Sequence, residues 1–522
     1  MNRLLPLVIL WIIVGTNIVQ AQHNCGVSRE AGELIKQRLM DNRRQFTKAQ
    51  VKQLMNNRSI TYIPVSIHSV ANTSGEGAAT EKEIFAFMCG LNKLYLQQDV
   101  QFFIYNQINF VNSDNLDLDA SSNASRQDMN SFQVNGTVNI TIARSQNNPS
   151  SSWYNPGADN IFLLKQMMSA EAKTEAHEIG HFFTLPHTFL GWEGIDAEAD
   201  YAGQSVPSPI GSGWGAFDPE VAARTGVNAN CQNTADGFCD TEADYYSSRT
   251  NCPYVVSVKD PHGDTLDPDE SNIMSYALDA CVTSFSNEQK AAVAMDIANR
   301  TWVTNTPGGT VDLSNSPPVT PVTPANNAAL GSISNPTVRL DWTAMNGATW
   351  YYIEVVGTII PGVWAININD LVYRGYIYSG DDHFDLPTTG LQAGKRYAWR
   401  ITPYSNYSTC ALASPWYRFE ATTSTTVDIK DLPIEKQMSL EIQGNPVTST
   451  VAPLKVYSAE NVVGNLSVYT LEGKALWTIE KTMFYKGESL VQLPVDDLSN
   501  GMYMVVLTTE RGLLQQKMLI QR

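Results

Sequence analysis

HEIGHFFTLPH, residues 177–187, is the stretch of sequence that decides the fold of this chain. Residues four apart on a helix share one face, so His177 and His181 can reach the same ion. Glu178 lies close enough to a water on that ion to accept its proton. A proline cannot continue the helix, so the chain must turn before His187, and the turn can bring this residue back as a third nitrogen ligand. Three protein ligands and one open position are typical of a catalytic zinc site.

Histidine is rare in this chain, which makes the cluster informative. There are 7 histidines in 522 residues, and three of them fall within this stretch. By chance, HExxH is expected in on the order of one per cent of chains of this length. The alternative is a surface amphipathic helix with incidental histidines, but the third histidine favours a metal site.

Followed by Thr188 and Phe189, the stretch resembles HExGHxxGLxHTF, the signature of the pappalysin-like metzincin metalloproteases. The resemblance implies a zinc endopeptidase with an α+β metzincin-like catalytic domain, in which a twisted sheet lies above an active-site helix. One position departs from the signature, because Thr184 stands where the family has glycine. That glycine adopts a left-handed conformation, which costs a β-branched residue about 1–2 kcal/mol. Either the fold tolerates this strain or the turn is built differently.

Residues 1–21 have the features of a secretory signal: a positive start, an apolar run and a small-residue cleavage site. A membrane anchor is the alternative, but the apolar run is short. No later segment is long and apolar enough to span a bilayer, so we expect no transmembrane segment in the mature chain. Export permits disulfides.

Residues 22–58 are rich in Lys, Arg, Gln and Asn, whereas the rest of the chain is acidic, which is typical of a pro-segment that ends near Arg58. The Asn-Cys-Gly motif at Cys25 resembles the cysteine switches that keep related zymogens latent. A thiolate is a good zinc ligand, so Cys25 can fill the open coordination position. The alternatives are a disulfide to Cys89 or an idle thiol.

Residues 59–303 are expected to form the catalytic domain. Their β-branched and aromatic content predicts strands over residues 60–68, 100–110 and 134–143. Apolar spacing predicts helices over residues 81–96, 170–183 and 285–298. The long stretch after the third histidine is rich in loop-forming residues. This order of strands and helices agrees with what the resemblance implies.

An acidic segment follows, DGFCDTEAD over residues 236–244, and it resembles the calcium-associated GDGxCDTxAD segment of the family. Carboxylates at Asp236, Asp240 and Asp244 suit a hard cation such as Ca²⁺. The alternative is an acidic loop that is simply solvated.

NIMSY, residues 272–276, resembles the NxMxY Met-turn of the same family. The resemblance places Met274 as an apolar floor beneath the three imidazoles, a role that suits its soft and adaptable side chain. Tyr276 could swing its hydroxyl toward the metal and hydrogen-bond the oxyanion of a tetrahedral intermediate.

Four of the 7 cysteines lie between the third histidine and the end of this domain: Cys231, Cys239, Cys252 and Cys281. Four cysteines allow three connectivities. The resemblance favours Cys252–Cys281, which leaves Cys231–Cys239. A second metal site is the alternative, but it lacks paired CxxC spacing. Cys410, in a later module, is expected to be unpaired within that module.

Two all-β sandwich modules are expected after a linker. Residues 304–327 are dense in Pro, Gly, Thr, Ser and Asn, which predicts an extended linker. In residues 328–424, the segment LQAGKRYAW resembles the fibronectin type III pattern LxxGxxYxW. The resemblance implies a tyrosine corner at Tyr397 and a sandwich core that contains Trp342.

Residues 427–522 resemble the C-terminal sorting domain of type IX secretion cargo, through the order of their GNPV, LSVYTLEG, LSNGMY and KMLIQR segments. The resemblance implies handling by the type IX secretion machinery and a final location that is secreted or at the outer-membrane surface. A second adhesion-type module with no sorting role is the alternative.

The net charge of −17 and the pI near 4.9 argue against nucleic acid or an anionic membrane as a partner. We therefore expect a secreted zinc-dependent endopeptidase that hydrolyses peptide bonds of proteins or peptides by a metal-activated water. One alternative is a non-catalytic, zinc-stabilised surface adhesion protein. Another is a zinc amidase or esterase that acts on small substrates.

Overall fold

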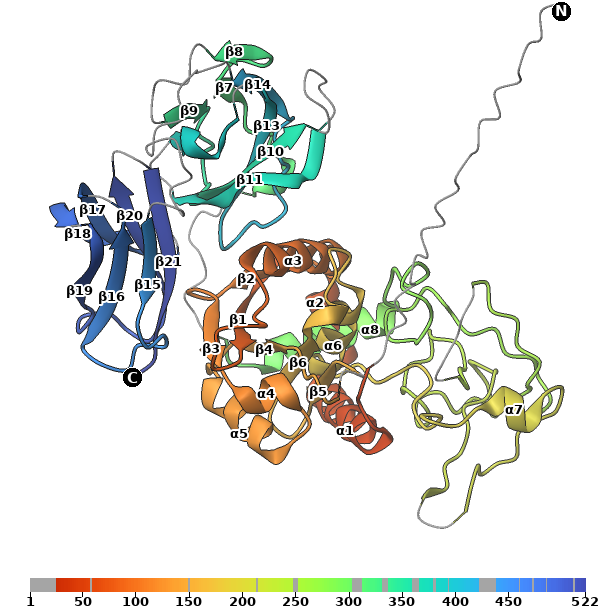
Figure 1. Cartoon of the computed structure of the whole chain (residues 1–522). Coiled ribbons are helices and arrows are strands. Elements are labelled where there is room, and N and C mark those ends of the chain that lie inside the picture. The colour runs from red at the N-terminus through yellow and green to blue at the C-terminus, as the bar shows by residue number, and fades with distance from the viewer. Residues whose placement is uncertain are drawn as a thin grey trace, which may run out of the picture.

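The structure, a computed structural model, describes most of the 522-residue chain. The described residues are 25–56, 59–148, 151–212, 215–246, 252–302, 312–330, 337–358, 366–378, 382–392, 394–421, 438–459, 461–471, 474–484, 486–509 and 512–522. The predicted signal peptide and the processing point at Arg58 lie outside them. The described chain is mixed α/β in its first part and all-β in its second part (Figure 1).

A mostly parallel six-stranded sheet organises the first part. Its strands are β1 (Thr61–Ala71), β2 (Val100–Ile104), β3 (Asn109–Asn112), β4 (Val138–Ala143), β5 (Trp153–Asn155) and β6 (Asn160–Leu164). They run in the order β2-β1-β4-β6-β5, and β3 pairs with the second half of β1. β5 is antiparallel to β6 and forms one edge of the sheet. Both β4 and β6 are buried along their whole length: β6 is a continuous apolar run after Asn160, as expected for a strand buried on both faces, whereas β4 also buries Asn139 and Thr141.

Helices cover both faces of this sheet (Figure 1). The side chains of β6 alternate: Ile161 and Leu163 join the core that contains α3 (Glu81–Tyr95) and α6 (Lys173–Phe182). Phe162 and Leu164 join a smaller core on the opposite face, beneath α4 (Asp114–Leu118) and α5 (Asn123–Phe132). The period-two alternation of a strand therefore separates the two layers.

The predicted helices and strands are largely confirmed. The exceptions are two strands whose bounds differ and the elements that were not predicted. The helix over residues 81–96 is α3, which Thr80 and Glu83 start with a capping box. The strand expected over residues 100–110 is two strands, because Asn106 adopts a left-handed conformation with φ 56° and turns the chain. The strand expected from residue 134 begins at Val138. Helix α5 and the β5–β6 pair were not predicted.

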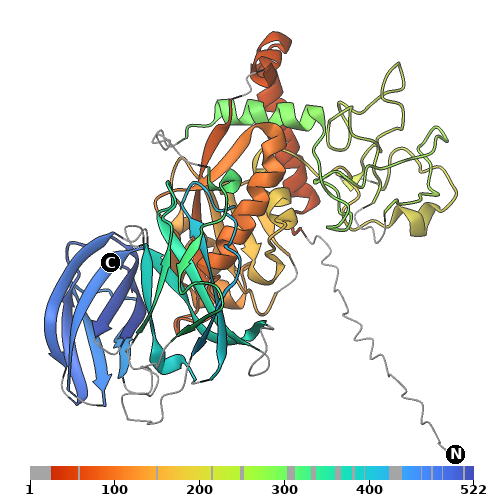
Figure 2. The same cartoon turned by 90° about the horizontal axis from the view of Figure 1, so that it is seen from above.

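The pro-segment forms two helices, α1 (Arg29–Gln45) and α2 (Lys48–Asn56), which pack on α8 (Asn287–Asn299) (Figures 1 and 2). Asn42 joins α1 to α8 through hydrogen bonds to Asp296, at 2.9 Å, and from Asn299, at 2.8 Å. The pro-segment is therefore docked as a folded element.

A left-handed turn at Thr184 follows α6 and reverses the chain. Thr184 has φ 66°, and its amide donates to the carbonyl of His181. The amide of Leu185 donates to the carbonyl of Gly180 at 2.9 Å. The hydroxyl of Thr184 is buried, with no hydrogen-bond partner among the described residues. The fold therefore tolerates a β-branched residue in the conformation that favours glycine.

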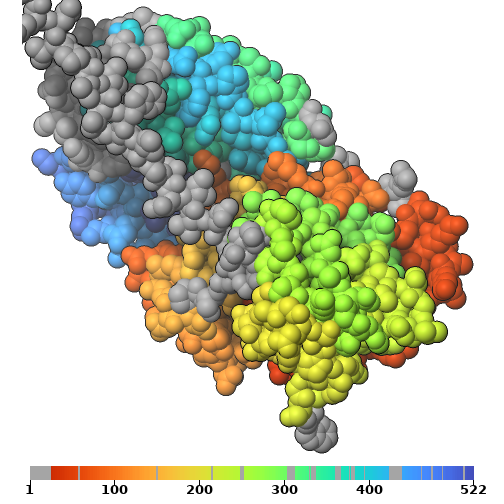
Figure 3. Space-filling view, turned by 90° about the vertical axis from the view of Figure 1, so that its right-hand side faces the viewer, coloured from red at the N-terminus to blue at the C-terminus, as the bar shows by residue number. Residues whose placement is uncertain are grey.

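The segment between this turn and α8 is largely irregular, as expected, and contains the short helix α7 (Ala197–Tyr201). It forms one face of the molecule, drawn yellow to green beside the red pro-segment in Figure 3. Two disulfides hold it, Cys231–Cys239 and Cys252–Cys281. Cys252–Cys281 is the pair that the family resemblance favours, and Cys231–Cys239 is the pair that it leaves.

The second module is a sandwich of two sheets. The strands of the larger sheet are β8 (Ala328–Leu330), β10 (Trp350–Thr358), β11 (Ile366–Tyr378), β13 (Arg396–Tyr404) and β14 (Tyr417–Ala421). Those of the smaller sheet are β7 (Pro321–Thr323), β9 (Thr337–Trp342) and β12 (His383–Pro387). Trp342 lies in the core, and the amide of Gln392 donates to the hydroxyl of Tyr397, as a tyrosine corner requires.

The linker prediction over residues 304–327 is wrong in its second half. β7 lies inside that range and pairs with β9, which follows it, and Leu313 and Val319 are buried. Proline and threonine therefore belong to an edge strand here, a position that proline tolerates. Residues 303–311 lie outside the described chain.

Cys410 is joined by a disulfide to Cys89, which lies outside the second module, so Cys410 has no partner within its module, as predicted, but the bond to Cys89 was not predicted. The same bond excludes a Cys25–Cys89 pair. It links α3 to the second module across 321 residues of sequence. Beside it, the ring of Phe85 on α3 lies 5.3 Å from the ring of Tyr404. The module is therefore fastened to the catalytic-domain candidate by a covalent bond and by apolar packing.

The third module is a sandwich that also contacts the first domain. One sheet contains β15 (Met438–Ile442), β16 (Val451–Ser458) and β19 (Gly487–Pro494). The other contains β17 (Val462–Thr470), β18 (Ala475–Phe484), β20 (Gly501–Thr509) and β21 (Gly512–Ile520). Lys517 on β21 forms a 2.7 Å ion pair with Glu81 at the start of α3.

Replacing Thr184 with glycine should stabilise the protein by about 1 kcal/mol, because glycine adopts the left-handed conformation without a Cβ clash. The change also removes a buried hydroxyl that has no partner in the described chain. The midpoint of urea unfolding of the full chain should rise. Thr184→Ala, which keeps the Cβ atom, is the matched control and should gain less. A lower midpoint for T184G would show that packing of the threonine outweighs its strain.

Removing the long-range disulfide with Cys89→Ser and Cys410→Ser should lower the free energy of unfolding by about 2–5 kcal/mol, because the bond closes a long loop of the unfolded chain. Thermal unfolding of the wild type and of the double variant measures the loss. Mass spectrometry of a non-reduced digest should find the Cys89 and Cys410 peptides joined. A digest that joins Cys89 to Cys25 instead would contradict this pairing.

Candidate metal centre

Four side chains converge beneath the sheet: Cys25, His177, His181 and His187. One ligand atom from each lies within 4.8 Å of the others. Within the described residues, this is the only group of three or more His, Cys, Asp or Glu side chains placed to hold a metal ion. The structure therefore joins the three predicted histidines to the cysteine of the pro-segment.

Helix α6 and the turn after it position the three histidines. His177 and His181 are one helical turn apart, and their ring centroids lie 4.7 Å from each other. The left-handed turn at Thr184 returns the chain, so that the Nε2 atoms of His181 and His187 lie 3.1 Å apart. All three imidazoles are buried.

Each imidazole is oriented by a hydrogen bond at its Nδ1 atom. The acceptors are the carbonyl of Ile273 for His177 at 2.7 Å, the carbonyl of Leu185 for His181 at 2.7 Å, and the carboxylate of Glu193 for His187 at 3.0 Å. A carbonyl can only accept, so Nδ1 must carry the proton in the first two rings. The Nε2 atoms are then the ligating atoms, as in metal sites where an outer hydrogen bond sets the tautomer.

Two of the separations between ligand atoms are close to those around a tetrahedral zinc-type ion. Metal–nitrogen bonds of about 2.0–2.1 Å and metal–sulfur bonds of about 2.3 Å put neighbouring tetrahedral ligand atoms about 3.3–3.6 Å apart. The His181–His187 separation is 3.1 Å, and Cys25 Sγ lies 3.5 Å from His181 Nε2. Burial, and then the neighbouring His187, lower the pKa of His181 well below its usual value. Its imidazole is therefore neutral, the form that binds metals.

Met274 lies against α6 below the histidines. A Cβ atom built on Gly180 would lie 2.4 Å from the sulfur of Met274, so glycine here allows the methionine side chain to pack closely on the helix. The carbonyl of Met274 accepts from the amide of Thr188 at 3.2 Å, which ties the Met-turn to the residue after the third ligand. The structure thus places Met274 where the resemblance implies.

Tyr276 reaches the same centre from the Met-turn. Its ring lies 4.9 Å from the ring of His187 and 5.6 Å from the ring of His177. Its hydroxyl donates a 2.8 Å hydrogen bond to the backbone carbonyl of Cys25. The group expected to bind an oxyanion therefore binds a carbonyl oxygen of the pro-segment here.

The pro-segment enters the centre along the edge strand of the sheet. Cys25 forms a parallel bridge with Ser152, just before β5, and the amide of Gly26 donates to the carbonyl of Ser152 at 2.6 Å. A Cβ atom on Gly26 would lie 2.5 Å from the hydroxyl oxygen of Ser151, so glycine allows this close approach without a shift of that side chain. Among the described cysteines, Cys25 is the one outside a disulfide.

Glu178 is buried beside the cysteine and the histidines. Burial raises its pKa to about 8, partly offset by the Cys25 thiol and by the backbone of Tyr154. Burial and the charge of Glu178 also raise the pKa of Cys25 well above its ordinary value. A divalent cation in the centre would lower both values, because its charge favours the ionised forms. Glu178 would then be a carboxylate that can accept a proton.

The three aspartates predicted to bind calcium do not converge. Asp240 lies at the N-terminus of α8, where it accepts from the hydroxyl of Ser286 at 2.7 Å and from the amide of Glu288 at 2.8 Å. Asp244 is buried and accepts from the hydroxyl of Thr188 at 2.6 Å. Asp240 therefore acts as a helix-end acceptor rather than as a partner of Asp244.

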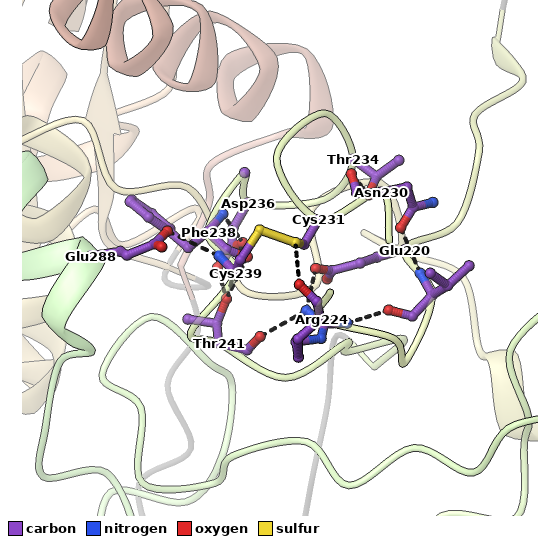
Figure 4. The surroundings of a disulfide bond; sticks show 12 residues. Glu220, Arg224, Asn230, Cys231, Thr234, Asp236, Phe238, Cys239, Thr241 and Glu288 are labelled. Carbon is purple, nitrogen blue, oxygen red and sulfur yellow. Dashed lines mark hydrogen bonds and ion pairs between the residues drawn. A yellow bond between two sulfur atoms is a disulfide. The ribbon is translucent and has the colours of Figure 1, made fainter. Parts of the chain in front are cut away.

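Asp236 instead shares its surroundings with Glu220, a residue that sequence analysis missed (Figure 4). One Glu220 oxygen accepts from Arg224 at 2.6 Å, and the other is buried without a hydrogen-bond partner among the described residues. Burial, and then the charge of Asp236, raise the pKa of Glu220. Burial also raises the pKa of Asp236 to about 7. No motif marks Glu220, which lies in a loop far along the chain from Asp236.

Glu193 is the second functional residue that sequence analysis missed. Besides orienting His187, its carboxylate accepts from the amide of Gly191 at 2.8 Å. Glu193 follows His187 by six positions, but it lies in a loop. A loop has no periodicity from which the return of the Glu193 side chain to His187 could be predicted.

Comparisons with known proteins bear mainly on the third module. No curated protein matches this chain. Among solved structures, it is similar to Escherichia coli alpha-2-macroglobulin activated by porcine elastase, with 12% identity over 36% of this chain and 22% of that chain and a TM-score of 0.14. It is also similar to an alpha-L-rhamnosidase from Dictyoglumus thermophilum, with 12% identity over 40% of this chain and 29% of that chain and a TM-score of 0.16.

The two tandem V-type regions of VCBP3, a v-region-containing chitin binding protein, match with 11% identity over 40% of this chain and all of theirs, at a TM-score of 0.15. The chain spans less than a third of the length of the first two structures. TM-scores this low say nothing about the activity of this chain.

Residues 442–521 match the family described as the secretion system C-terminal sorting domain. Within the described residues, no helix is long and apolar enough to cross a membrane. The chain therefore carries a type IX secretion sorting domain and is handled by that machinery, as a protein that is secreted or attached to the cell surface.

Proposed function

We propose that this protein is a zinc-dependent endopeptidase of the pappalysin-like metzincin type, which hydrolyses peptide bonds of secreted or external proteins. The observation that carries the proposal is the convergence of three imidazoles, each oriented through Nδ1, next to the buried carboxylate of Glu178. A structural zinc site closes all four positions with permanent ligands. Here the fourth ligand is Cys25, which comes from a segment expected to be removed.

The residues around the centre supply the steps of peptide hydrolysis. Zinc held by the three histidines would polarise the scissile carbonyl and make water acidic near neutral pH. Glu178 is placed to accept the proton of the attacking water and to pass it to the leaving amine. Tyr276 is placed to donate to the oxyanion, as it donates to the Cys25 carbonyl in this structure.

The same contacts support a latent state. Cys25 occupies the fourth position of the metal cluster, and its carbonyl engages Tyr276. The segment that follows fills the edge of β5 through Gly26. Removal of the pro-segment would therefore free the fourth coordination position of the metal, the hydroxyl of Tyr276 and the edge of the sheet at the same time.

Calcium is a second cofactor that we propose, at a site different from the predicted one. Glu220 and Asp236 are buried together, and one Glu220 oxygen has no hydrogen-bond partner in the described chain. A hard divalent cation prefers such oxygen ligands. Asp240, which is engaged at the start of α8, is not part of this site.

Glu178→Ala should keep its zinc and lose proteolysis, because the substitution removes the proton acceptor but no ligand. Casein cleavage by the mature variant should fall by at least about 100-fold, the usual contribution of a general base. Zinc content, measured by plasma mass spectrometry, should stay near that of the wild type. Glu171→Ala, an exposed residue shortly before α6, is the matched control and should keep full activity. Undiminished cleavage by E178A would overturn the mechanism.

Cys25→Ala should remove sulfur from the metal coordination shell of the full-length chain. X-ray absorption at the zinc edge should show one sulfur scatterer in the wild type and none in the variant, because the other described cysteines are in disulfides. The variant should also cleave casein before its pro-segment is removed. The wild-type chain cut after Arg58 is the control and should also lack sulfur. A sulfur scatterer that persists in C25A would contradict the latency proposal.

A further inference from the structure

A cavity of about 370 Å³ lies beside the metal centre, between the pro-segment and the edge strand of the sheet. The pro-segment residues Val27 and Ser28 line one side of it. Trp153 and Asn155 of β5 line another side, and Arg126 of α5 lines a third. When the pro-segment leaves, the walls made by β5 and α5 remain.

Arg126 is the one charged residue among those that line the cavity. It is exposed, and its guanidinium makes no hydrogen bond or ion pair with any described residue. The seven other described arginines between residues 25 and 302 each bind a carboxylate, a carbonyl or both: Arg29, Arg38, Arg43, Arg44, Arg144, Arg224 and Arg300. In a chain with a net charge of −17, an arginine that lacks such a partner is unusual.

The cavity lies where a substrate chain must pass. Val27 and Ser28 follow Cys25, the candidate metal ligand, by two and three positions, which in an extended chain is about 7–10 Å. The amide of Gly26 already pairs with the sheet edge at Ser152. An extended peptide can pair with the same edge once the pro-segment has gone. A substrate residue two or three positions from the scissile bond would then face the cavity.

We propose that this cavity is a substrate subsite for an acidic side chain, which pairs with the guanidinium of Arg126. A planar guanidinium with its donors uncommitted suits a carboxylate, which it can bind through two parallel hydrogen bonds. The cavity is large enough for an aspartate or glutamate side chain, and no acidic residue lines it to compete. This inference rests on the proposed function, because it assigns the substrate class of the same cleft.

The test uses the mature enzyme and two sets of fluorogenic peptides, varied at the second and third positions on either side of the scissile bond. At one of these positions, Asp or Glu should be cleaved with a kcat/KM at least about ten-fold above Asn or Gln, which have the same shape but no charge. Arg126→Glu should abolish or reverse this preference, and Arg126→Lys should keep part of it. Gln127→Ala, at the exposed neighbouring position, should leave it unchanged.

Equal cleavage of acid and amide peptides by the wild type, or an unchanged acid preference in R126E, would overturn the subsite. Peptide binding to the mature E178A variant separates this outcome from a failure of the proposed function. Fluorescence anisotropy should show tighter binding of the acidic peptide than of its amide partner, and the difference should vanish when R126E is added. If the wild type cleaves no peptide but this binding difference is present, the hydrolytic mechanism fails and the subsite stands.

Discussion

Three imidazoles can share one ion in this protein only if the chain reverses within a few residues of α6. Two of them are one helical turn apart, and the third follows a turn through Thr184 at φ 66°. The reversal places the chain so that the amide of Thr188 meets the Met-turn, which in turn holds Tyr276 over the histidines. The packing that depends on this turn thus offsets the strain at Thr184, as expected for strain near a functional site.

The predicted pro-segment engages the same groups to which we propose to assign catalytic roles. The thiol of Cys25 lies in the metal cluster, its carbonyl accepts from Tyr276, and Gly26 pairs with the sheet edge. A segment that imitates a substrate carbonyl and a substrate strand can inhibit without distorting the site. The helices that follow supply further docking, because Asn42 on α1 is hydrogen-bonded to α8. The short segment around Cys25 is therefore held in place by a larger folded one.

The two β-modules are fastened to the first domain in different ways. The second module is joined through Cys89–Cys410 and through aromatic packing at Phe85. The sorting domain is joined by the ion pair between Lys517 and Glu81 and by Met502, which is buried in the core of the first domain. A disulfide across a long loop contributes several kcal/mol. The attachment of the second module thus includes a covalent bond, whereas the described contacts of the sorting domain are non-covalent.

The sequence by itself identified the candidate metal ligands, because HExxH spacing places His177 and His181 on one face of a helix. It also pointed to the sorting domain, whose motifs are local. It also placed the helix and most strands, whose apolar periodicity is short-range. Only the tertiary structure decided that Cys410 pairs with Cys89, that Glu220 joins Asp236, and that Glu193 orients His187. These contacts join loops or distant modules, where no periodicity relates one residue to another, so they exist only once the chain has packed.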